Sequence, residues 1–256
     1  MVVHEPVIGA DRNVITVRKL RVTKGPEHTV ILSNVNLHVN HGEFVAILGA
    51  SGSGKTTLLR CLSLRDKWDA GEITFKGVTL TALSIWGKFK IRKQCAYLSQ
   101  QPELNQNKTA AKNILSGRFR TSALWRILTG LVSRNEHFTA YDYLDRVGLL
   151  EKAKIKAGSL SGGEKQRVAI GRALAWGAQV IYADEPISGL DPQSAARVME
   201  DLRNLCNEHK LTVICCIHNV ELAEQYCTRM MGLSEGVIQF DVSGRRLLST
   251  EKNLIL

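Results

Sequence analysis

Short apolar runs separated by polar stretches divide this chain into a succession of predicted strands and helices. Two strand-like runs, Val14 to Val22 and Thr29 to Val39, predict a β-rich lobe at the start. Five consecutive apolar residues at Phe44 to Leu48 are typical of a strand that is buried on both faces. Further strands are expected at Glu72 to Lys76 and at Cys95 to Ser99. The first part of the chain is therefore expected to be rich in β-structure.

The pattern becomes helical between Thr109 and Lys156, where apolar residues recur with a period of about 3.6 residues. This block looks inserted, because strands and helices alternate after Ser161. The elements expected there are a helix through Ala175, a strand at Gln179 to Ala183, a helix at Pro192 to His209, a strand at Leu211 to Ile217, a helix at Asn219 to Cys227 and a β-like run at Gly236 to Phe240. Strand and helix in turn predict an α/β fold whose mostly parallel sheet is covered on both faces.

The composition is that of a folded globular protein. Of the 256 residues, 44% are hydrophobic and 23% are charged, which argues against a disordered or fibrous chain. No apolar run approaches the ~20 residues that span a bilayer, and the N-terminus lacks the pattern of a secretory signal, so a cytosolic chain is expected. The net charge of +10 is spread along the chain without a nucleic-acid motif. An anionic membrane surface, an acidic partner or simply solvated faces would explain it.

The six cysteines show no metal-binding pattern. They are scattered without C-x-x-C spacing, so we expect reduced side chains in the core. Cys215 and Cys216 are neighbours in a predicted strand, and successive side chains of a strand point to opposite faces. The two thiols are therefore expected on opposite sides of the sheet.

A glycine-rich segment follows the strand at Phe44 to Leu48 and leads into a leucine-rich helical stretch. In this setting the glycines let backbone N–H groups turn toward a polyphosphate, and the helix N-terminus adds the positive end of its dipole. Lys55 is expected to reach the β- and γ-phosphates, and Thr56 to ligate Mg²⁺. A Gly/Ser-rich linker would not explain the buried strand before it. The predicted phosphate-binding residues are Gly49, Ala50, Ser51, Gly52, Ser53, Gly54, Lys55, Thr56 and Thr57.

Two carboxylates, Asp184 and Glu185, end the apolar run Val180 to Ala183. Parallel sheets present catalytic groups at the carboxyl ends of their strands. Asp184 is placed to hold Mg²⁺, directly or through water, and Glu185 to orient or deprotonate the water that attacks the γ-phosphate. Alone, the pair would equally suit an acidic strand end that caps the next segment.

A second candidate anion site is the Ser-Gly-Gly turn that opens the helix after Leu160. Ser161 offers an N-cap hydroxyl, Gly162 and Gly163 expose N–H groups, and Glu164 follows in the first turn. One chain needs only one triphosphate cradle, so two such sites suggest a nucleotide held between the loop of one subunit and the turn of another. An ordinary helix cap is the alternative.

Taken together, these segments resemble the ATPase subunit of ABC transporters, in the family's order and approximate spacing and over nearly the whole chain. The resemblance implies one P-loop ATPase domain at 1–256. Its nucleotide-binding core, with an antiparallel β lobe, is expected at 1–100 and 157–256, and its helical subdomain at 101–156, with the signature turn at 160–164. The resemblance rests on Gly49 to Thr56, Gln100, Leu160 to Glu164, Asp184 with Glu185, Ser188 to Asp191 and His218.

The resemblance also implies roles for single positions. Gln100 would contact Mg²⁺ and the attacking water, and His218 would touch the γ-phosphate and help Glu185 to hold that water. Asp191 would lie in the loop that crosses the dimer interface. The plain alternatives are a polar loop residue, a hydrogen-bonded strand-end histidine and an Asp-Pro turn. The implied catalytic set is thus Glu185, His218, Gln100 and Lys55, and the implied Mg²⁺ ligands are Thr56, Gln100 and Asp184.

One departure from the family concerns the adenine base. Members usually carry an aromatic residue in the early β lobe that stacks on adenine, and the matching stretch, Val22 to His28, has none. Lys24 or His28 would cover the base instead, or its recognition would be loose. The adenine contact is therefore left open.

The family implies the partners. Two copies are expected to close on two ATP molecules with Mg²⁺ and to drive transmembrane permease subunits, which an extracytoplasmic substrate-binding protein supplies. The chain would then lie peripherally at the cytoplasmic face of the cell membrane. The stretches Gln100 to Asn105 and Asn113 to Arg118 are similar to those of bacterial phosphonate-import ATPase subunits. Uptake of phosphonate or a related phosphorus oxyanion is the resulting prediction.

Two other functions share these motifs. The ATPase of an exporter or of a lipoprotein-release system would carry every catalytic residue named above. Soluble ABC proteins of translation or DNA repair are less favoured, because they usually have two cassettes or a long coiled coil, and this chain has one cassette and no heptads.

A further hypothesis concerns the predicted helical insertion. Its apolar residues at helical spacing predict packing, and its arginines predict a solvated face. Its arginines and Trp125 suggest a position near the membrane or the transmembrane partner. The residues concerned are Leu124, Ile127, Leu128 and Leu131, with Arg118, Arg120, Arg126 and Arg134 beside them.

Overall fold

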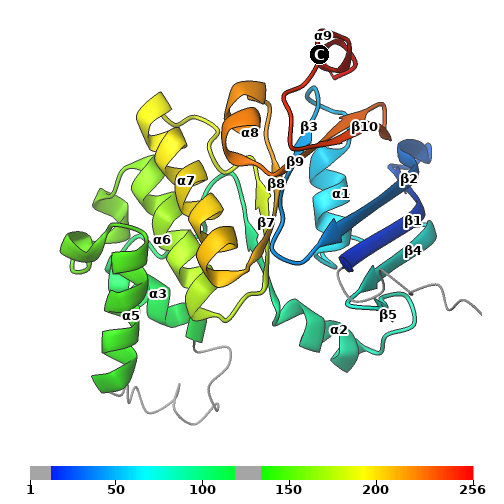
Figure 1. Cartoon of the computed structure of the whole chain (residues 1–256). Helices are drawn as coiled ribbons and strands as arrows, with labels where there is room; N and C mark the ends of the chain where they lie inside the picture. Colours follow the sequence, from blue (N-terminus) through cyan, green and yellow to red (C-terminus); the bar gives the residue numbers. More distant parts are fainter. Residues whose placement is uncertain (1–12, 119–133, 256) are drawn as a thin grey trace, which may run out of the picture.

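The computed structural model describes residues 13–118 and 134–255, and its largest element is a six-stranded sheet (Figure 1). The strand order is β10-β9-β3-β8-β7-β6, and all neighbours are parallel except β10 with β9. Residues of β3, β7 and β8 are almost all buried, because helices or the second sheet cover both faces. The strands are β3 (Phe44–Leu48), β6 (Cys95–Leu98), β7 (Val180–Asp184), β8 (Thr212–Cys216), β9 (Arg229–Ser234) and β10 (Val237–Ser243).

The smaller sheet is antiparallel and has the order β2-β1-β4-β5. Alternating buried and exposed positions along β1 and β2 show that one face packs inward and the other meets solvent. This sheet is the predicted antiparallel β lobe, and together with the parallel sheet it confirms the predicted fold class. Its strands are β1 (Asn13–Lys24), β2 (Thr29–Asn40), β4 (Ala70–Phe75) and β5 (Val78–Thr79).

Two apolar cores lie on opposite faces of the large sheet. One joins the sheet to the helices α3, α5, α6 and α7, and the other joins it to α1 and the β lobe. Cys215 belongs to the first core and Cys216 to the second, as their alternation predicts, and all six cysteines are free thiols. The helices are α1 (Lys55–Leu62), α2 (Ile85–Arg92), α3 (Ala110–Arg118), α5 (Arg134–Arg146), α6 (Gly162–Ala175), α7 (Pro192–His209), α8 (Val220–Tyr226) and α9 (Ser249–Asn253), with 3-10 turns η1 (Leu150–Lys152) and η2 (Ala157–Ser159).

Apart from the 3-10 turns, the structure adds four elements to the predicted ones, namely β5, α2, β9 and α9. The sequence of β9 contains a glycine that breaks its apolar run, and a tight turn at Glu235 and Gly236 leads directly into β10. β9 nevertheless pairs with β3 and so supports the strand that carries the phosphate loop. α2 buries only Ile91, so its sequence shows little of the periodicity of a core-facing helix.

The predicted helical region is present on both sides of the segment at 119–133. α3 and α5 both pack on α6. The hypothesis about Trp125, Arg120 and Arg126, together with the apolar residues at 124, 127, 128 and 131, lies outside the described residues, as do the side chains of Arg118 and Arg134. Within the ranges 13–118 and 134–255, no helix is both long and apolar enough to cross a bilayer.

Candidate nucleotide-binding site

The glycine-rich loop joins the buried end of β3 to the start of α1, as predicted. A Cβ atom at Gly49 would lie 2.2 Å from the backbone oxygen of Leu233, so the close approach of β9 requires glycine there. Gly54 has φ +104°, a conformation that other residues rarely adopt, and it directly precedes the first residue of α1. The loop therefore returns tightly enough for its backbone N–H groups to surround an anion at the helix N-terminus.

Lys55 lies inside this loop. Its Nζ donates hydrogen bonds of 2.8 Å to the backbone oxygens of Gly49 and Ala50, and the residue is only 5% exposed. Burial lowers the pKa of the ammonium group, and the negative charges of Glu185 and Asp184 oppose that shift. The lysine is thus held at the position where a polyphosphate would meet the loop.

The next residue, Thr56, meets Asp184 across the site. The Thr56 hydroxyl donates to Asp184 Oδ1 at 2.9 Å, and the phenol of Tyr97 donates to Asp184 Oδ2 at 2.7 Å. Burial and the carboxylate raise the pKa of Tyr97 far above its usual value, so the phenol remains a donor. The hydroxyl and carboxylate oxygens fit Mg²⁺, which prefers oxygen ligands, and the predicted ligands Thr56 and Asp184 are therefore brought together.

Glu185 lies next to Asp184 in a strained backbone conformation. Its φ of +48° is uncommon for a residue with a side chain, and its N–H donates to the oxygen of Cys216 on the neighbouring strand. Its Oε1 lies 2.6 Å from Nε2 of His218, whose Nδ1 lies 2.9 Å from the oxygen of Gly49. The turn after β7 therefore directs the carboxylate toward His218 and the phosphate loop, as the predicted roles require.

The contacts of His218 place both of its ring nitrogens. The oxygen of Gly49 can only accept, so Nδ1 is the donor in that contact. Nε2 faces the Glu185 carboxylate at 2.6 Å. Glu185 and His218 thus form one pair beside the phosphate loop, a geometry that suits acid–base chemistry.

Gln100 lies in the loop that follows β6 and reaches the Glu185 turn through Ser188. Its Nε2 donates to the hydroxyl of Ser188 at 2.9 Å, and the N–H of Ser188 donates to the oxygen of Glu185 at 3.1 Å. In the described parts of the chain no hydrogen bond joins Gln100 to Thr56 or Asp184. The structure thus places Gln100 beside the Glu185 turn and apart from the other two predicted metal ligands.

The signature turn forms a second cluster. Ser161 caps α6 in a reciprocal capping box with Glu164, whose carboxylate also bonds the ammonium of Lys152. Asp191 caps α7 by accepting from the N–H of Ser194, and a Cβ on Gly163 would lie 2.8 Å from the Cβ of Ser194. The predicted residues Ser161 to Glu164 are therefore packed against the Asp191 loop, while Ser161 itself stays exposed.

The β lobe near the loop contains no aromatic side chain in the stretch 22–28, as the sequence shows. Lys24 forms an ion pair of 3.0 Å with Asp66, and Thr23 is bonded to Asp69. His28 lies at the turn between β1 and β2 with φ +51°. The candidate Lys24 is thus tied to the segment after α1.

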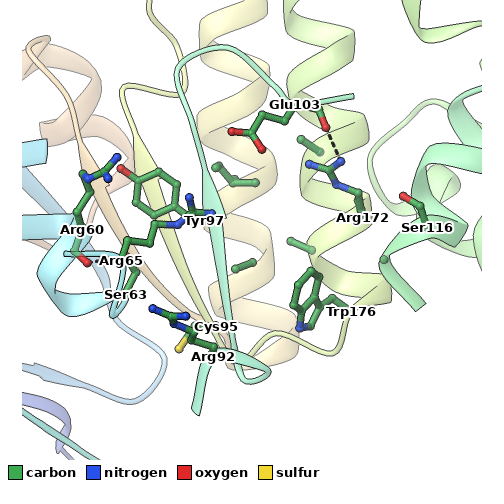
Figure 2. Close-up of a pocket in the computed structure, with 15 residues that line it drawn as sticks. Arg60, Ser63, Arg65, Arg92, Cys95, Tyr97, Glu103, Ser116, Arg172 and Trp176 are labelled. Atoms are coloured by element: carbon green, nitrogen blue, oxygen red, sulfur yellow. Dashed lines mark hydrogen bonds between the residues drawn. The ribbon is translucent and has the colours of Figure 1, made fainter. Parts of the chain in front are cut away.

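Tyr97 also lines a cavity of about 560 Å³ (Figure 2). Four arginines line it, and Arg60 is paired with Asp66. The other three form no ion pair within the described parts of the chain: Arg65 lies over the Tyr97 ring at 4.3 Å, Arg92 bonds the oxygen of Leu64, and Arg172 bonds the oxygen of Glu103. Burial lowers the pKa of Arg172, which reflects the cost of desolvating this charge. The cavity is strongly basic.

Sequence reasoning did not assign a role to Tyr97. The predicted functional residue of this region was Gln100, which follows the strand. A tyrosine in a half-buried strand is usually explained by packing. The contact became visible only when parallel pairing of β6 with β7 placed Tyr97 beside the strand that ends at Asp184. No local pattern indicates that register.

The fold and the glycine-rich loop together define a P-loop nucleotide-binding protein. Residues 32–188 match the ABC transporter family. The chain is 40% identical to the phosphonates import ATP-binding protein PhnC of Bacillus anthracis over 84% of each chain. It is 38% identical to the PhnC of Lactococcus lactis, over 84% of this chain and 88% of that one. It is also 37% identical to the hypophosphite import ATP-binding protein HtxD of Stutzerimonas stutzeri, over 86% of this chain and 64% of that one.

Solved structures agree with this assignment. The chain superposes on cbiO1 of Clostridium perfringens, part of the ABC transporter complex cbiONQ, with a TM-score of 0.81 at 25% identity, covering 91% of this chain and 89% of that one. It superposes on the ATP-binding cassette MJ0796, in a dimeric post-hydrolysis state bound to ADP and Pi, with a TM-score of 0.78 at 30% identity, covering 91% and 100%. The chain therefore belongs to the ABC transporter family and is an ATP-hydrolysing, nucleotide-binding subunit of it.

Proposed function

We propose that this chain powers the import of a phosphonate or a related phosphorus oxyanion through permease subunits at the cytoplasmic face of a cell membrane. The names of the similar import proteins support the substrate class, since two of them are phosphonate importers and one is a hypophosphite importer. The observation that carries the ATPase chemistry is the convergence of Lys55, Asp184 and the Glu185–His218 pair at one end of the parallel sheet.

The proposed chemistry begins with the triphosphate in the Gly49 to Thr57 loop. Backbone N–H groups and Lys55 bind the phosphates, and a charged lysine there stabilises the negative charge that develops on the transferred group. Glu185 orients the attacking water and accepts its proton, and His218 holds the carboxylate in place and contacts the γ-phosphate. Gln100, in the loop after β6, lies beside the same turn through its hydrogen bond to Ser188 and would contact that water.

Thr56 and Asp184 would hold Mg²⁺, with Gln100 as the third proposed ligand. When bound, the ion would neutralise charge on the phosphate oxygens. The Thr56–Asp184 hydrogen bond keeps the two oxygen ligands together, and Tyr97 fixes the second carboxylate oxygen. These side chains therefore prepare the metal position without a change in the backbone.

A second copy would complete the site. We propose that Ser161 to Glu164 of one copy contact the nucleotide on the loop of the other, with Asp191 at the interface. Support comes from the exposure of Ser161 and from the packing of this turn on the Asp191 loop. Because they are packed together, the two segments would approach a second copy as one surface. ATP then favours the closed pair because it binds that state more tightly, and hydrolysis removes the preference.

The arginine-lined cavity supports contact with a permease. It lies between α1, β6, α3 and α6, so it joins the core at 1–100 and 157–256 to the proposed helical subdomain at 101–156. Among the described residues, four arginines against one carboxylate, that of Glu103, line the cavity, and this excess of positive charge favours an acidic segment as the occupant. An extracytoplasmic substrate-binding protein would supply the cargo to the other side of that permease.

The central experiment is Glu185→Gln in the purified chain. Loss of the acceptor carboxylate should slow ATP hydrolysis by orders of magnitude, while ATP affinity stays within a few-fold because the phosphate loop is unchanged. Hydrolysis is measured as phosphate release and affinity by calorimetry. The control Glu221→Gln, an exposed carboxylate at the start of α8, should leave both unchanged. Normal turnover by Glu185→Gln would remove Glu185 from the mechanism.

The substrate class needs a separate test. Cells that lack this chain should fail to grow with a phosphonate as the sole phosphorus source and recover with the wild type but not with Glu185→Gln. Growth that is unaffected, or loss of an export phenotype instead, would contradict the import assignment while leaving the ATPase assignment intact.

A further inference from the structure

The helix α2 presents its apolar residues to solvent. Its N-cap Ser84 accepts a hydrogen bond from the N–H of Gly87, and among its own residues only Ile91 is buried. Ile85 is 86% exposed, Trp86 80% and Phe89 41%. Large apolar side chains at this exposure normally occur singly, whereas these three fall on adjacent turns of one short helix. Packing inside this chain therefore does not explain them.

Along the sequence, the charges on both sides of α2 have the same sign, although Asp66 lies near Lys88 and Arg92 in the fold. Between Glu72 and Glu103 the sequence contains no acidic residue, and its basic residues are Lys76, Lys88, Lys90, Arg92 and Lys93. On a helix, Lys88 and Arg92 follow Ile85 and Phe89 by three residues, and Lys90 and Lys93 follow Trp86 and Phe89 by four, so bases flank the apolar stripe on both sides. The ammonium of Lys93 indeed lies 4.9 Å from the Phe89 ring.

The position of α2 leaves the nucleotide site free. The helix directly precedes β6 and so lies at the amino end of that strand, whereas Asp184 and Glu185 lie at the carboxyl end of β7, its parallel neighbour (Figure 1). Arg92 of α2 also lines the arginine cavity beside Tyr97 (Figure 2). If that cavity faces a permease, as proposed above, α2 lies on the membrane-directed side of the chain.

We propose that α2 is an interfacial helix that binds an anionic lipid surface, with Ile85, Trp86 and Phe89 inserted among the headgroups. An exposed apolar stripe with tryptophan and flanking lysines is the pattern of helices that lie in a membrane interface. Their long side chains keep the charge in water near the lipid phosphates while the apolar stripe leaves water. A membrane accepts a protruding stripe without a complementary groove, and the net charge of +10 adds a general attraction.

The test is sedimentation of the full purified chain, without nucleotide or permease, with sucrose-loaded vesicles. We expect binding to vesicles of phosphatidylglycerol with phosphatidylcholine and little binding to phosphatidylcholine alone. Added salt should weaken the binding because it screens the lysines. Absent binding to the anionic vesicles, or equal binding to both kinds, would overturn the proposal. A protein segment as the true occupant of α2 would give the first of these results.

Two pairs of variants assign the binding to α2. Ile85→Ser with Trp86→Ser removes the stripe at exposed positions and should reduce vesicle binding at least tenfold. Its control is Val30→Ser with Val237→Ser, two exposed valines elsewhere. Lys88→Gln with Lys90→Gln should reduce binding roughly tenfold, given the contribution of each lysine near an anionic surface. Its control is Lys154→Gln with Lys156→Gln, which are exposed lysines before η2.

A test variant that binds like the wild type, or a control that loses binding equally, would contradict the role of α2. Circular dichroism and ATP affinity should be unchanged in all four variants, and they show that each is folded. The orientation of α2 toward the membrane rests on the proposed function. Vesicle binding by α2 does not rest on it, so failure of the vesicle experiment and failure of the proposed function can be told apart.

Discussion

At the scale of single residues, a small number of contacts fixes the positions of the two carboxylates in the site. Asp184 is held from both sides, by Thr56 and by Tyr97. Glu185 is held by a strained backbone and by His218. Each carboxylate thus has one defined position, which catalysis requires because misplacement of a reacting group by about 1 Å costs rate.

The first prediction concerns the phenol of Tyr97. Tyr97→Phe keeps the ring under Arg65 and removes only the hydrogen bond to Asp184. A hydrogen bond to a charged group contributes roughly 1.5–3 kcal/mol, so the Mg²⁺ concentration needed for tight nucleotide binding should rise by about tenfold. Nucleotide binding without Mg²⁺ should not change. Titration of Mg²⁺ against binding of a fluorescent ATP analogue measures both.

The control for Tyr97 is Tyr226→Phe, at the end of α8, where the ring packs against the apolar core that contains α7. It should leave the Mg²⁺ dependence unaltered. If Tyr97→Phe weakens binding equally with and without Mg²⁺, the phenol supports the fold in general and does not position Asp184.

At the scale of elements, the contact between α6 and α7 contains a buried acid. Asp201 on α7 has a buried Oδ2 atom that finds no hydrogen-bond partner among the residues described at 13–118 and 134–255, and burial raises the pKa of its carboxyl to about 7. The charges of Arg167 on α6 and Arg197 on α7 oppose this shift, and Glu200 reinforces it. Between about pH 4 and 7 the folded chain therefore binds more protons here than the unfolded chain, so stability falls as pH rises through that window.

Asp201→Asn removes this titration. The variant should unfold at a higher temperature than the wild type at about pH 8, by a free-energy difference on the order of 1–3 kcal/mol, and the gap should be clearly smaller at about pH 5. Thermal unfolding followed by circular dichroism at both pH values measures it. A gap that is the same at both pH values would show that Asp201 does not titrate in this range.

Elements differ in how well the sequence predicts them. α7 was predicted from Pro192 to His209 with the bounds that the structure gives, because Asp191 caps it, Pro192 suits its first turn and its apolar stripe is regular. β9 and α2 were missed, since the first is broken by a glycine and the second packs through one residue. Helices and strands with strong local signals can thus be predicted from the sequence. The others depend on tertiary pairing, which the sequence does not show.

The site follows the same division. The phosphate loop and the two carboxylates were predictable because each consists of neighbouring residues with a chemical requirement. Tyr97 was not, because its partner lies 87 positions away and only the register of β6 on β7 brings them together. Asp201 was missed for a similar reason, since burial of a helix face depends on the neighbouring helix.

At the scale of the whole molecule, the two anion-binding segments lie at different places. The phosphate loop is surrounded by β9, α1 and His218, while the signature turn packs on the Asp191 loop. Within the described parts of the chain, no hydrogen bond joins the phosphate loop to the signature turn. The exposure of Ser161 is what the proposed contact with a nucleotide on another copy requires.

Ser161→Arg tests that shared site. The larger side chain should prevent two copies from closing on ATP, while the isolated chain stays folded because Ser161 is exposed and a lost N-cap costs about 1 kcal/mol. The experiment uses the Glu185→Gln background, where ATP is not consumed, and sedimentation velocity with and without ATP. The matched control Ser161→Ala removes the cap without adding bulk, so it should still give an ATP-dependent dimer. If Ser161→Arg dimerises as readily as this control, the nucleotide is not held between the signature turn and a second copy, even if Glu185 remains the catalytic carboxylate.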